Sequence, residues 1–433
     1  MVTAPSLTSG LHAHLVQVIT EHGGWIGFDH FMALVLYAPG LGYYQRGDGQ
    51  IGNLPAGPRG QASDFATAPG ISPLFGRALA VQVSEALQRS QTDTVWEFGA
   101  GTGAMAAQLL DALGHQVRRY TIVDLSGSLQ QRQRATLARF GDTVTWVTRL
   151  PDSLQGVVVG NEVLDAMPVR LLARTTGQWH ERGVALAPGG GLCWQDRPTG
   201  LRPPIEVAGV HDYLTEIHPQ AEAFVATLVD RLARGAVFLI DYGFAEREYY
   251  HPQRAMGTVM CHQAHRADDN PLADVGAKDI TAHVNFSGIA LAAQHAADQR
   301  AATQQATLDA ARRQAATRQE GAAQPSETPQ EGTAQQVATR QEARPWADGP
   351  VATVGQPAPA AGWHLLGYTS QARFLFNCGL AGMLETVGVA ERSMANKLLM
   401  EHEMGELFKV IGFCRGTPWD PIGFVHGDRS HTL

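Results

Sequence analysis

An apolar run that leads into three alternating glycines is the feature that most constrains how this chain of 433 residues can fold. Residues 94–98 are predicted to form a buried strand. Gly99, Gly101 and Gly103 follow it, and residues 105–113 then have the apolar spacing of a helix. Glycine lets the backbone approach a ligand closely, and the amino end of a helix favours anionic groups. This order predicts a nucleotide-type ligand at the end of the strand.

Further strands and helices alternate along the chain. Short apolar runs occur at 120–123, 144–147, 156–160 and 236–240, and helical patterns separate several of them. Such alternation predicts an α/β fold, a doubly wound Rossmann-like sheet of parallel strands. Asp124 ends the second strand, where an acid can accept hydrogen bonds from both ribose hydroxyls.

The glycine turn is compatible with two classes of enzyme. Gly99 to Ala104 also satisfies the dinucleotide pattern G-x-G-x-x-A, which is typical of an NAD-dependent oxidoreductase. Glu97, two residues before the first glycine, favours S-adenosylmethionine and a methyltransferase instead. We therefore count Glu97 with the glycines as a cofactor-binding candidate.

Polar side chains follow the strand at 156–160. Asn161, Glu162 and Asp165 come directly after it, and ligands of open α/β sheets lie beyond the carboxyl ends of strands. We count Asn161 as a further cofactor-binding candidate. Two carboxylates suit a cationic or amine methyl acceptor, because they can hold it by charge-assisted bonds and help to remove its proton. Either acid could instead cap a following helix.

Two more candidates are expected near the same edge. Asp241 follows the strand at 236–240, and residues 279–286 alternate between polar and apolar. The polar face carries Asp279, Thr281, His283 and Asn285, and it faces either solvent or the cleft. We take Asp241 and His283 as further catalytic candidates. The possible metal ligands of a neighbouring loop-like region are His251, Cys261, His262 and His265. Their spacing matches no standard metal-binding pattern, so we predict no metal site.

The pattern of the chain divides it into four parts. Residues 1–92 are predicted to form a helical and loop cap, with helix over 11–36, and residues 93–290 the core, with an antiparallel insertion at about 169–220. Residues 291–361 are predicted to be a low-complexity, disordered insertion, aromatic-free from 291 to 345 and containing ATRQE twice, although its first part could be a solvated helix. Residues 362–433 complete the catalytic domain, as helix to Lys409 and a final strand near 422–425.

Composition excludes several classes of protein. The net charge of −8 gives no basic footprint for nucleic acid, and no window approaches 18 uninterrupted apolar residues, so we expect no membrane insertion. Four widely spaced cysteines favour a reducing compartment. The chain is expected to be a soluble cytoplasmic protein.

Taken in order, several short motifs resemble those of the MidA family, which includes the mitochondrial complex I assembly-factor arginine methyltransferases. The matching stretches are 37–44, 64–69, 72–76, 97–103, 161–168, 241–243, 279–284 and 404–409. The resemblance implies a class I methyltransferase fold and S-adenosylmethionine. For the mitochondrial members it implies symmetric dimethylation of an arginine on a subunit of the NADH:quinone oxidoreductase, so a protein substrate is expected.

Carried over by position, the resemblance also implies residue roles. Gly99, Gly101 and Gly103 would line the cofactor and Asp124 would meet its ribose, Thr67 and Pro69 would cover its methionine end, and Glu162 and Asp165 would face the acceptor. The chain has Ser63 where the family usually has glycine, and Gly70 and Asn285 where it usually has acids. A non-catalytic assembly factor that keeps the cofactor fold is therefore the alternative hypothesis.

Overall fold

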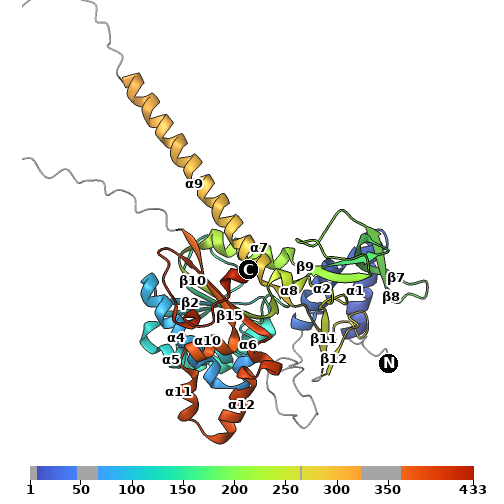
Figure 1. Ribbon diagram of the computed structural model, residues 1–433, viewed down its shortest axis with the longest axis horizontal. Coiled ribbons are helices and arrows are strands. Elements are labelled where there is room, and N and C mark those ends of the chain that lie inside the picture. Colours follow the sequence, from blue (N-terminus) through green and yellow to red (C-terminus); the bar gives the residue numbers. More distant parts are fainter. Residues whose placement is uncertain (1–6, 46–66, 264–265, 323–361) are drawn as a thin grey trace, which may run out of the picture. The chain divides into compact units, whose positions relative to one another are not determined.

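A seven-strand path forms the central sheet of the computed structural model, which describes residues 7–45, 67–263, 266–322 and 362–433 (Figure 1). Its order is β15-β16-β10-β5-β2-β3-β4, and the short β14 (Val284–Asn285) also pairs with β10. Five strands are parallel, namely β2 (Thr94–Phe98), β3 (Arg119–Val123), β4 (Val144–Val147), β5 (Leu154–Asn161) and β10 (Leu232–Phe244). At one edge, β16 (Phe408–Arg415) pairs antiparallel with β10, and β15 (Trp363–Ser370) pairs antiparallel with β16. The predicted doubly wound α/β fold is confirmed.

Helices cover both faces of this sheet because alternate strand residues point to opposite sides. On one face, Val157 and Val159 pack with α4 (Pro73–Ser90), α5 (Ala104–Leu113), α10 (Gln371–Asn377) and α12 (Val389–Leu399). On the other face, Val158 packs with α7 (Pro219–Arg231) and the first turns of α9 (Phe286–Ala322). Two buried cores therefore enclose the sheet. The remaining helices of this part are α3 (Ala68–Ile71), α6 (Gly127–Leu137), α8 (Glu246–Tyr249) and α11 (Leu380–Glu385).

The predicted antiparallel insertion is also present. It contains β6 (Arg170–Thr175), β7 (Gln178–Leu186), β8 (Leu192–Pro198) and β9 (Tyr213–Ile217), and β7 pairs with the N-terminal β1 (Trp25–Gly27). The N-terminal helices α1 (Leu7–Glu21) and α2 (Phe28–Tyr37) contact this sheet, although they are distant in sequence (Figure 1). A separate small sheet joins β11 (Met260–Gln263) to β12 (Arg266–Asp268) and β13 (Asp279–Thr281). Ile280 of β13 shares the core of the N-terminal helices.

Three local predictions are wrong. The helix expected over 11–36 is broken by Gly23 and Gly24, both at positive φ, and by β1. The stretch expected to be helical up to Lys409 contains β15 and the first residues of β16, because a short apolar run does not distinguish a buried strand from a buried helix. Ile422–Phe424 is a 3₁₀ turn (η5) rather than the final strand.

The chain divides into two units, Met1–Ala297 with Gly362–Leu433, and Asp298–Ala361. The second unit contains the rest of α9, whose described side chains are almost all exposed, so the first part of the low-complexity segment is helical. Residues 323–361 lie outside the described residues. Within the described ranges, no helix is both long and apolar enough to cross a membrane.

Candidate functional site

A cavity of about 690 Å³ lies at the carboxyl ends of β2, β3 and β5. Its walls come from the glycine turn after β2, the segment after β3, the loop after β5, one face of α7 and the N-terminal cap. Open α/β sheets bind their ligands at this edge. The described residues that line it include Tyr37, Tyr44, Thr67, Gly99, Gly101, Asp124, Leu125, Ser126, Leu129, Thr148, Leu150, Asn161, Glu162, Asp165, Phe224 and Asp279.

The glycine turn is shaped to admit a ligand against the backbone. Gly99 (φ 63°), Gly101 (φ 52°) and Gly103 (φ 82°) all adopt the left-handed conformation that favours glycine. A Cβ on Gly99 would lie 2.9 Å from Val163 Cγ2, which is too close for an ordinary contact. Gly99 and Gly101 line the cavity, whereas Gly103 lies outside it as the residue before α5.

Asp124 is held in place at the end of β3. Its Oδ1 accepts a hydrogen bond from the Ser126 amide (2.8 Å), and its Oδ2 accepts one from Gln133 Nε2 (2.7 Å). Gln133 also donates to the Gly101 carbonyl (3.1 Å) and so ties the acid to the glycine turn. The Leu125 amide also hydrogen-bonds to this carboxylate, whose two oxygens offer about four acceptor sites in all, so capacity remains for a ribose hydroxyl. Gln133 is a site residue that the sequence analysis missed, because a helical glutamine carries no distinctive signal.

The cavity wall beside Asp124 is apolar. Leu125, Leu129 and Leu150 line it together with Thr148, and Leu125 is 70 % exposed. A planar base would gain contact area from such a wall, and the threonine hydroxyl could hydrogen-bond to it. The described residues therefore fit a nucleoside-type ligand, and Asp124 would be available to its ribose hydroxyls.

Glu162 occupies a strained position at the mouth of β5. Its φ is 53°, and strain of this kind is concentrated at functional sites. Asn161 Nδ2 donates to its Oε1 (2.8 Å), and the Ala68 amide also hydrogen-bonds to its carboxylate. Burial is the main cause that raises the pKa of Glu162 to about 8. Ala68 follows Thr67, so the Thr67–Pro69 segment does reach this acid, although only Thr67 lines the cavity.

Asp165 carries a buried oxygen with spare bonding capacity. The Tyr242 hydroxyl donates to its Oδ2 (2.6 Å), whereas its Oδ1 is buried and has no hydrogen-bond partner among the described residues. Burial raises the pKa of Asp165 to about 6. Residues 162–169 form a loop rather than a helix in the described structure, so neither Asp165 nor Glu162 is a helix cap. An unpaired acceptor on a cavity wall suits a ligand that brings N–H donors.

Asp241 and His283 lie behind the cavity wall and do not line it. Asp241 Oδ2 accepts from the amides of Val163 (3.1 Å), Leu164 (2.8 Å) and Asp165 (3.2 Å), so it fixes the loop that carries the acids. The His283 ring packs edge-on against Tyr242 (5.1 Å), and burial lowers the pKa of His283 to about 4. The structure therefore does not bring these two predicted catalytic residues into the cavity lining, and their part in catalysis stays a prediction.

Three further candidate positions lie outside the cavity lining. Glu97 is buried and its Oε2 accepts from the Tyr120 hydroxyl (2.6 Å), which supports the strand beneath the glycine turn. Gly70 and Asn285, where the family usually has acids, do not line the cavity either, and the Gly288 amide donates to Asn285 Oδ1 (3.3 Å). The two departures from the family therefore leave the acids of the cavity in place.

Residues of the N-terminal cap complete the cavity and were missed from the sequence. The Tyr37 hydroxyl donates to the Ala166 carbonyl (2.8 Å), and the Tyr44 hydroxyl donates to Asp279 Oδ1 (2.7 Å). The two tyrosine rings stack with their centroids 5.5 Å apart. Asp279 belongs to the polar face of residues 279–286, which was expected to face either solvent or the cleft. The structure places Asp279 on the cavity wall.

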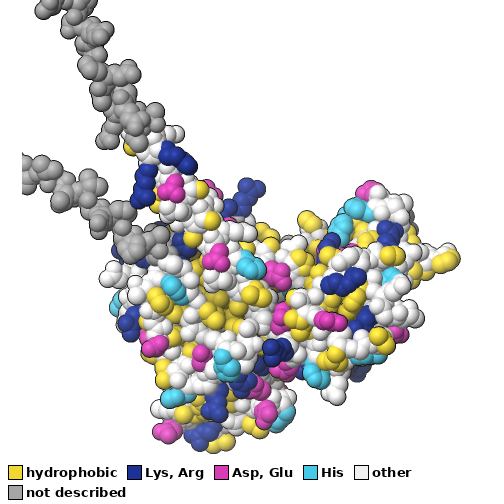
Figure 2. Space-filling model, turned by 45° about the horizontal axis from the view of Figure 1, so that its top comes forward, with side chains coloured by type: hydrophobic (Ala, Val, Ile, Leu, Met, Phe, Trp, Pro, Cys, Tyr) yellow, Lys and Arg dark blue, Asp and Glu magenta, His cyan; other side chains and the backbone are white. Residues whose placement is uncertain are grey.

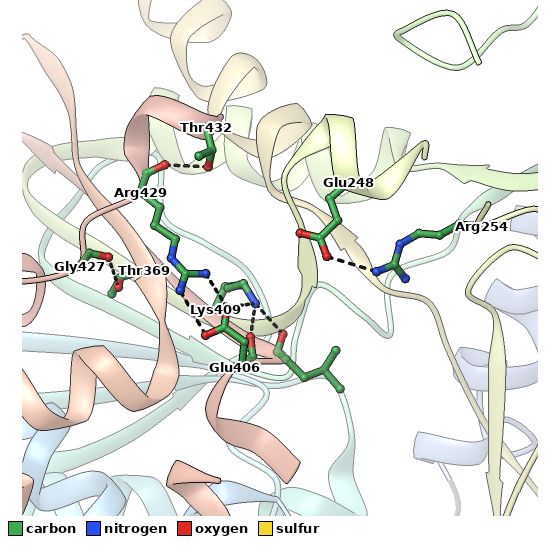
Figure 3. A network of polar contacts seen from close by, with 9 residues as sticks. Glu248, Arg254, Thr369, Glu406, Lys409, Gly427, Arg429 and Thr432 are labelled. Carbon is green, nitrogen blue, oxygen red and sulfur yellow. Dashed lines mark hydrogen bonds and ion pairs between the residues drawn. The ribbon is translucent and has the colours of Figure 1, made fainter. Parts of the chain in front are cut away.

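The motif at 404–409 stabilises an edge of the sheet (Figure 3). Lys409 at the start of β16 donates to the carbonyls of Glu406 and Leu407 and pairs with the Glu406 carboxylate, which also binds Arg429. Burial lowers the pKa of Lys409. The network includes no residue of the cavity lining, so we assign this motif to the structure of the edge.

Two other expectations concern metals and nucleic acid. Among the residues that the structure describes, no group of three or more His, Cys, Asp or Glu could hold a metal ion, and His265 lies outside those residues. On the face drawn in Figure 2, Lys and Arg are interspersed with Asp and Glu.

Comparison with known proteins agrees with this geometry. Residues 76–305, more than half of the chain, match a family described as S-adenosyl-L-methionine-dependent methyltransferases. A Burkholderia thailandensis methyltransferase crystallised with S-adenosyl-homocysteine is 41% identical, covers 100% of both chains and has a TM-score of 0.80. The protein arginine methyltransferase NDUFAF7 homolog of Caenorhabditis elegans is 27% identical over 65% of this chain and 71% of its own length. The mouse mitochondrial NDUFAF7 is 28% identical over 65% and 69%.

The doubly wound sheet, the glycine cradle and these matches define an S-adenosylmethionine-dependent methyltransferase of the class I fold. Within that class, the chain belongs to the MidA family, as its motifs predict. The predicted cofactor, S-adenosylmethionine, is confirmed at the level of the family.

Proposed function

We propose that this methyltransferase modifies an arginine side chain of a protein. The observation that carries the proposal is the charge of the cavity. Asp124, Glu162, Asp165 and Asp279 line it, and no Lys, Arg or His is found among its described lining residues. Asp124 is assigned to the ribose, which leaves three acids for the acceptor. A guanidinium supplies five N–H donors and a permanent positive charge, and carboxylates bind it better than any neutral group.

The residues of this chain would perform two tasks, which are to orient the acceptor and to take up its proton. When bound, S-adenosylmethionine supplies an electrophilic methyl group on its sulfonium. Glu162 and Asp165 would orient one guanidinium nitrogen, and positioning of this kind provides much of the rate of a direct displacement. The nitrogen must lose a proton as its new bond forms, and that proton would pass to Glu162. Burial raises the pKa of Glu162 to about 8 in the free site, and the positive charge of a bound guanidinium would lower it, so the side chain would be ionised and able to take up the proton.

We also propose which protein carries the acceptor arginine. The relatives described above carry the name protein arginine methyltransferase, which supports arginine as the acceptor. The resemblance to the MidA family supports a subunit of respiratory complex I as the partner. All four cysteines are free thiols, which agrees with a reducing, cytoplasmic location.

A labelling experiment tests the proposal. The purified protein and methyl-labelled S-adenosylmethionine are added to a lysate from cells that lack this protein, and labelled amino acids are identified after hydrolysis. We expect methylated arginine in one main protein band. Absence of any labelled arginine overturns the proposed activity and favours the non-catalytic assembly factor. Titration with NAD in parallel tests the oxidoreductase alternative.

A further inference from the structure

A second acidic wall faces the cavity from the cap side. Asp279 of β13 is 3 % exposed, lines the cavity and accepts a hydrogen bond from the Tyr44 hydroxyl at 2.7 Å. Tyr44 belongs to the short turn η1 (Tyr43–Gln45), and its ring stacks on Tyr37, which also lines the cavity. An acid and two aromatic rings therefore come together from segments 235 residues apart.

This wall and the loop after β5 share one electrostatic environment. The charge of Asp279 contributes to the raised pKa of both Glu162 and Tyr37. Several carboxylates in a partly desolvated cavity repel one another, and a bound cation would relieve that repulsion. The geometry therefore favours a ligand whose positive charge reaches both walls at once.

The acidic wall is also tied to the cofactor loop. Ser126 Oγ donates to the Tyr44 carbonyl (2.8 Å), and the Ser126 amide donates to Asp124 Oδ1. The same tyrosine thus contacts the ribose-binding segment through its backbone and Asp279 through its hydroxyl. Tyr44 is placed to hold Asp279 at a fixed position relative to the bound cofactor.

We propose that Asp279, positioned by Tyr44, is a second guanidinium-binding group, which selects a planar cation over an ammonium ion. The inference rests on the proposed arginine methylation and names how that acceptor is recognised. A guanidinium has N–H groups on more than one edge, so carboxylates on two walls can bind it together. The face of Tyr37 can cover the plane of the guanidinium, a contact that an ammonium ion does not reproduce as well. The compact ammonium group of a lysine would reach the carboxylates of only one wall.

Binding of small probes tests this assignment. The protein is saturated with S-adenosylhomocysteine and titrated by calorimetry with N-acetylarginine methylamide, its lysine analogue and its neutral citrulline analogue. We expect the arginine probe to bind at least about tenfold more tightly than the other two. Asp279→Asn should remove most of this preference, and Tyr44→Phe should reduce it, while affinity for S-adenosylhomocysteine stays the same.

Tyr249→Phe is the matched control. The Tyr249 hydroxyl donates to buried Glu216 at 2.8 Å, which is the same chemistry outside the cavity lining. If this variant loses probe binding as Tyr44→Phe does, the effect is one of general stability and the proposal is wrong. An arginine probe that fails to bind the wild type, or binds Asp279→Asn as tightly, also overturns it. A loss of S-adenosylhomocysteine affinity in Asp279→Asn would assign this acid to the cofactor instead.

The failure of this inference is distinguishable from failure of the proposed function. If the lysate shows labelled arginine and Asp279→Asn leaves KM for the labelled protein unchanged, arginine methylation stands and the role of Asp279 is wrong. If the wild type labels no arginine, the proposed function fails whatever the probes show.

Discussion

Single carboxylates decide how this cavity divides between cofactor and acceptor. Asp124 lies in a frame of fixed donors, with Ser126 and Gln133 each bonded to one of its oxygens. Glu162 and Asp165 lie on a loop, and Asp165 keeps a buried oxygen free of hydrogen bonds from described residues. The arrangement around Asp124 suits the neutral hydroxyls of a ribose, whereas Glu162 and Asp165 suit a cation with several N–H donors. Substitutions at the two places should therefore have separate effects.

Asp124→Ala should weaken binding of S-adenosylmethionine by about 1–3 kcal/mol, because it removes the charge-assisted acceptors for the ribose hydroxyls. Calorimetric titration of both proteins measures the difference. Gln133→Ala is the companion variant, since it loosens Asp124 without removing its charge, and it should have a smaller effect. Equal affinity of wild type and Asp124→Ala would show that the ribose lies elsewhere.

Glu162→Gln should leave cofactor affinity nearly unchanged and lower methyl transfer by about 10²–10⁴-fold, the usual contribution of a positioned proton acceptor. The glutamine keeps the shape of the side chain and can still accept from Asn161, but it cannot take up the proton. Transfer to the labelled protein of the lysate is measured at saturating cofactor. A normal rate in this variant would remove Glu162 from the chemistry.

The same substitution should change the pH dependence of stability in the absence of ligands. Burial raises the pKa of Glu162 from 4.5 to about 8 in the folded protein, so the folded state loses stability as pH rises through this window. Glu162→Gln removes that loss. The free energy of unfolding of the variant should gain on the wild type by up to about 1.4 kcal/mol per pH unit between pH 5 and 8. Denaturant titrations at several pH values measure the gap, and a constant gap would contradict the raised pKa.

At the scale of elements, the loop after β5 depends on its neighbour β10. Three consecutive amides of the loop donate to a single oxygen of Asp241, and the Tyr242 hydroxyl reaches Asp165. Strand β10 therefore holds in place the loop that carries Glu162 and Asp165. Its own acid, Asp241, does not line the cavity. His283 lies one layer further back, against the Tyr242 ring.

Asp241→Ala should destabilise the fold by about 2–5 kcal/mol, because it leaves three amide donors of a buried loop without their acceptor. Asp241→Asn keeps one oxygen in the same place and should cost less. Thermal unfolding of both variants gives the comparison. If Asp241→Ala lowers activity but unfolds like the wild type, Asp241 acts on the ligand directly and the positioning role is wrong.

The order of elements explains which parts of the site the sequence could predict. The glycine turn and Asp124 follow directly from strands, so local order was enough to place them. Asp241 and His283 were expected at the cavity because a polar residue at a strand end can point to a ligand or to backbone amides, and sequence does not distinguish the two. Tyr44 and Asp279 meet only through the packing of the cap, which no local pattern encodes. The antiparallel β16 was missed because its apolar residues are nearly continuous.

At the scale of the whole molecule, the sequence of the catalytic domain is interrupted by an inserted segment. Residues up to 297 and from 362 onward belong to one unit, and β16 of the later part pairs with β10 of the earlier part in the central sheet. The described part of the inserted unit is the exposed portion of α9. By contrast, Phe286, Ile289 and Ala293 at the start of the same helix are buried in the core. We therefore expect the boundary between required and dispensable chain to fall inside α9.

Deletion of residues 300–355 should leave folding and S-adenosylmethionine binding intact. The side chains of α9 at 300–315 are almost all exposed, so their removal loses little buried apolar surface, and a shorter connection costs less entropy to close. Thermal unfolding should stay cooperative, with Tm changed by no more than about 2 °C, which corresponds to about 1–2 kcal/mol in a unit of this size. Ile289→Ala is the control from the buried end of the helix, and it should cost about 2–5 kcal/mol. The prediction is wrong if the deletion variant unfolds without cooperativity, or if it binds S-adenosylmethionine more weakly than the full chain does. Either result would show that the inserted segment packs on the catalytic unit.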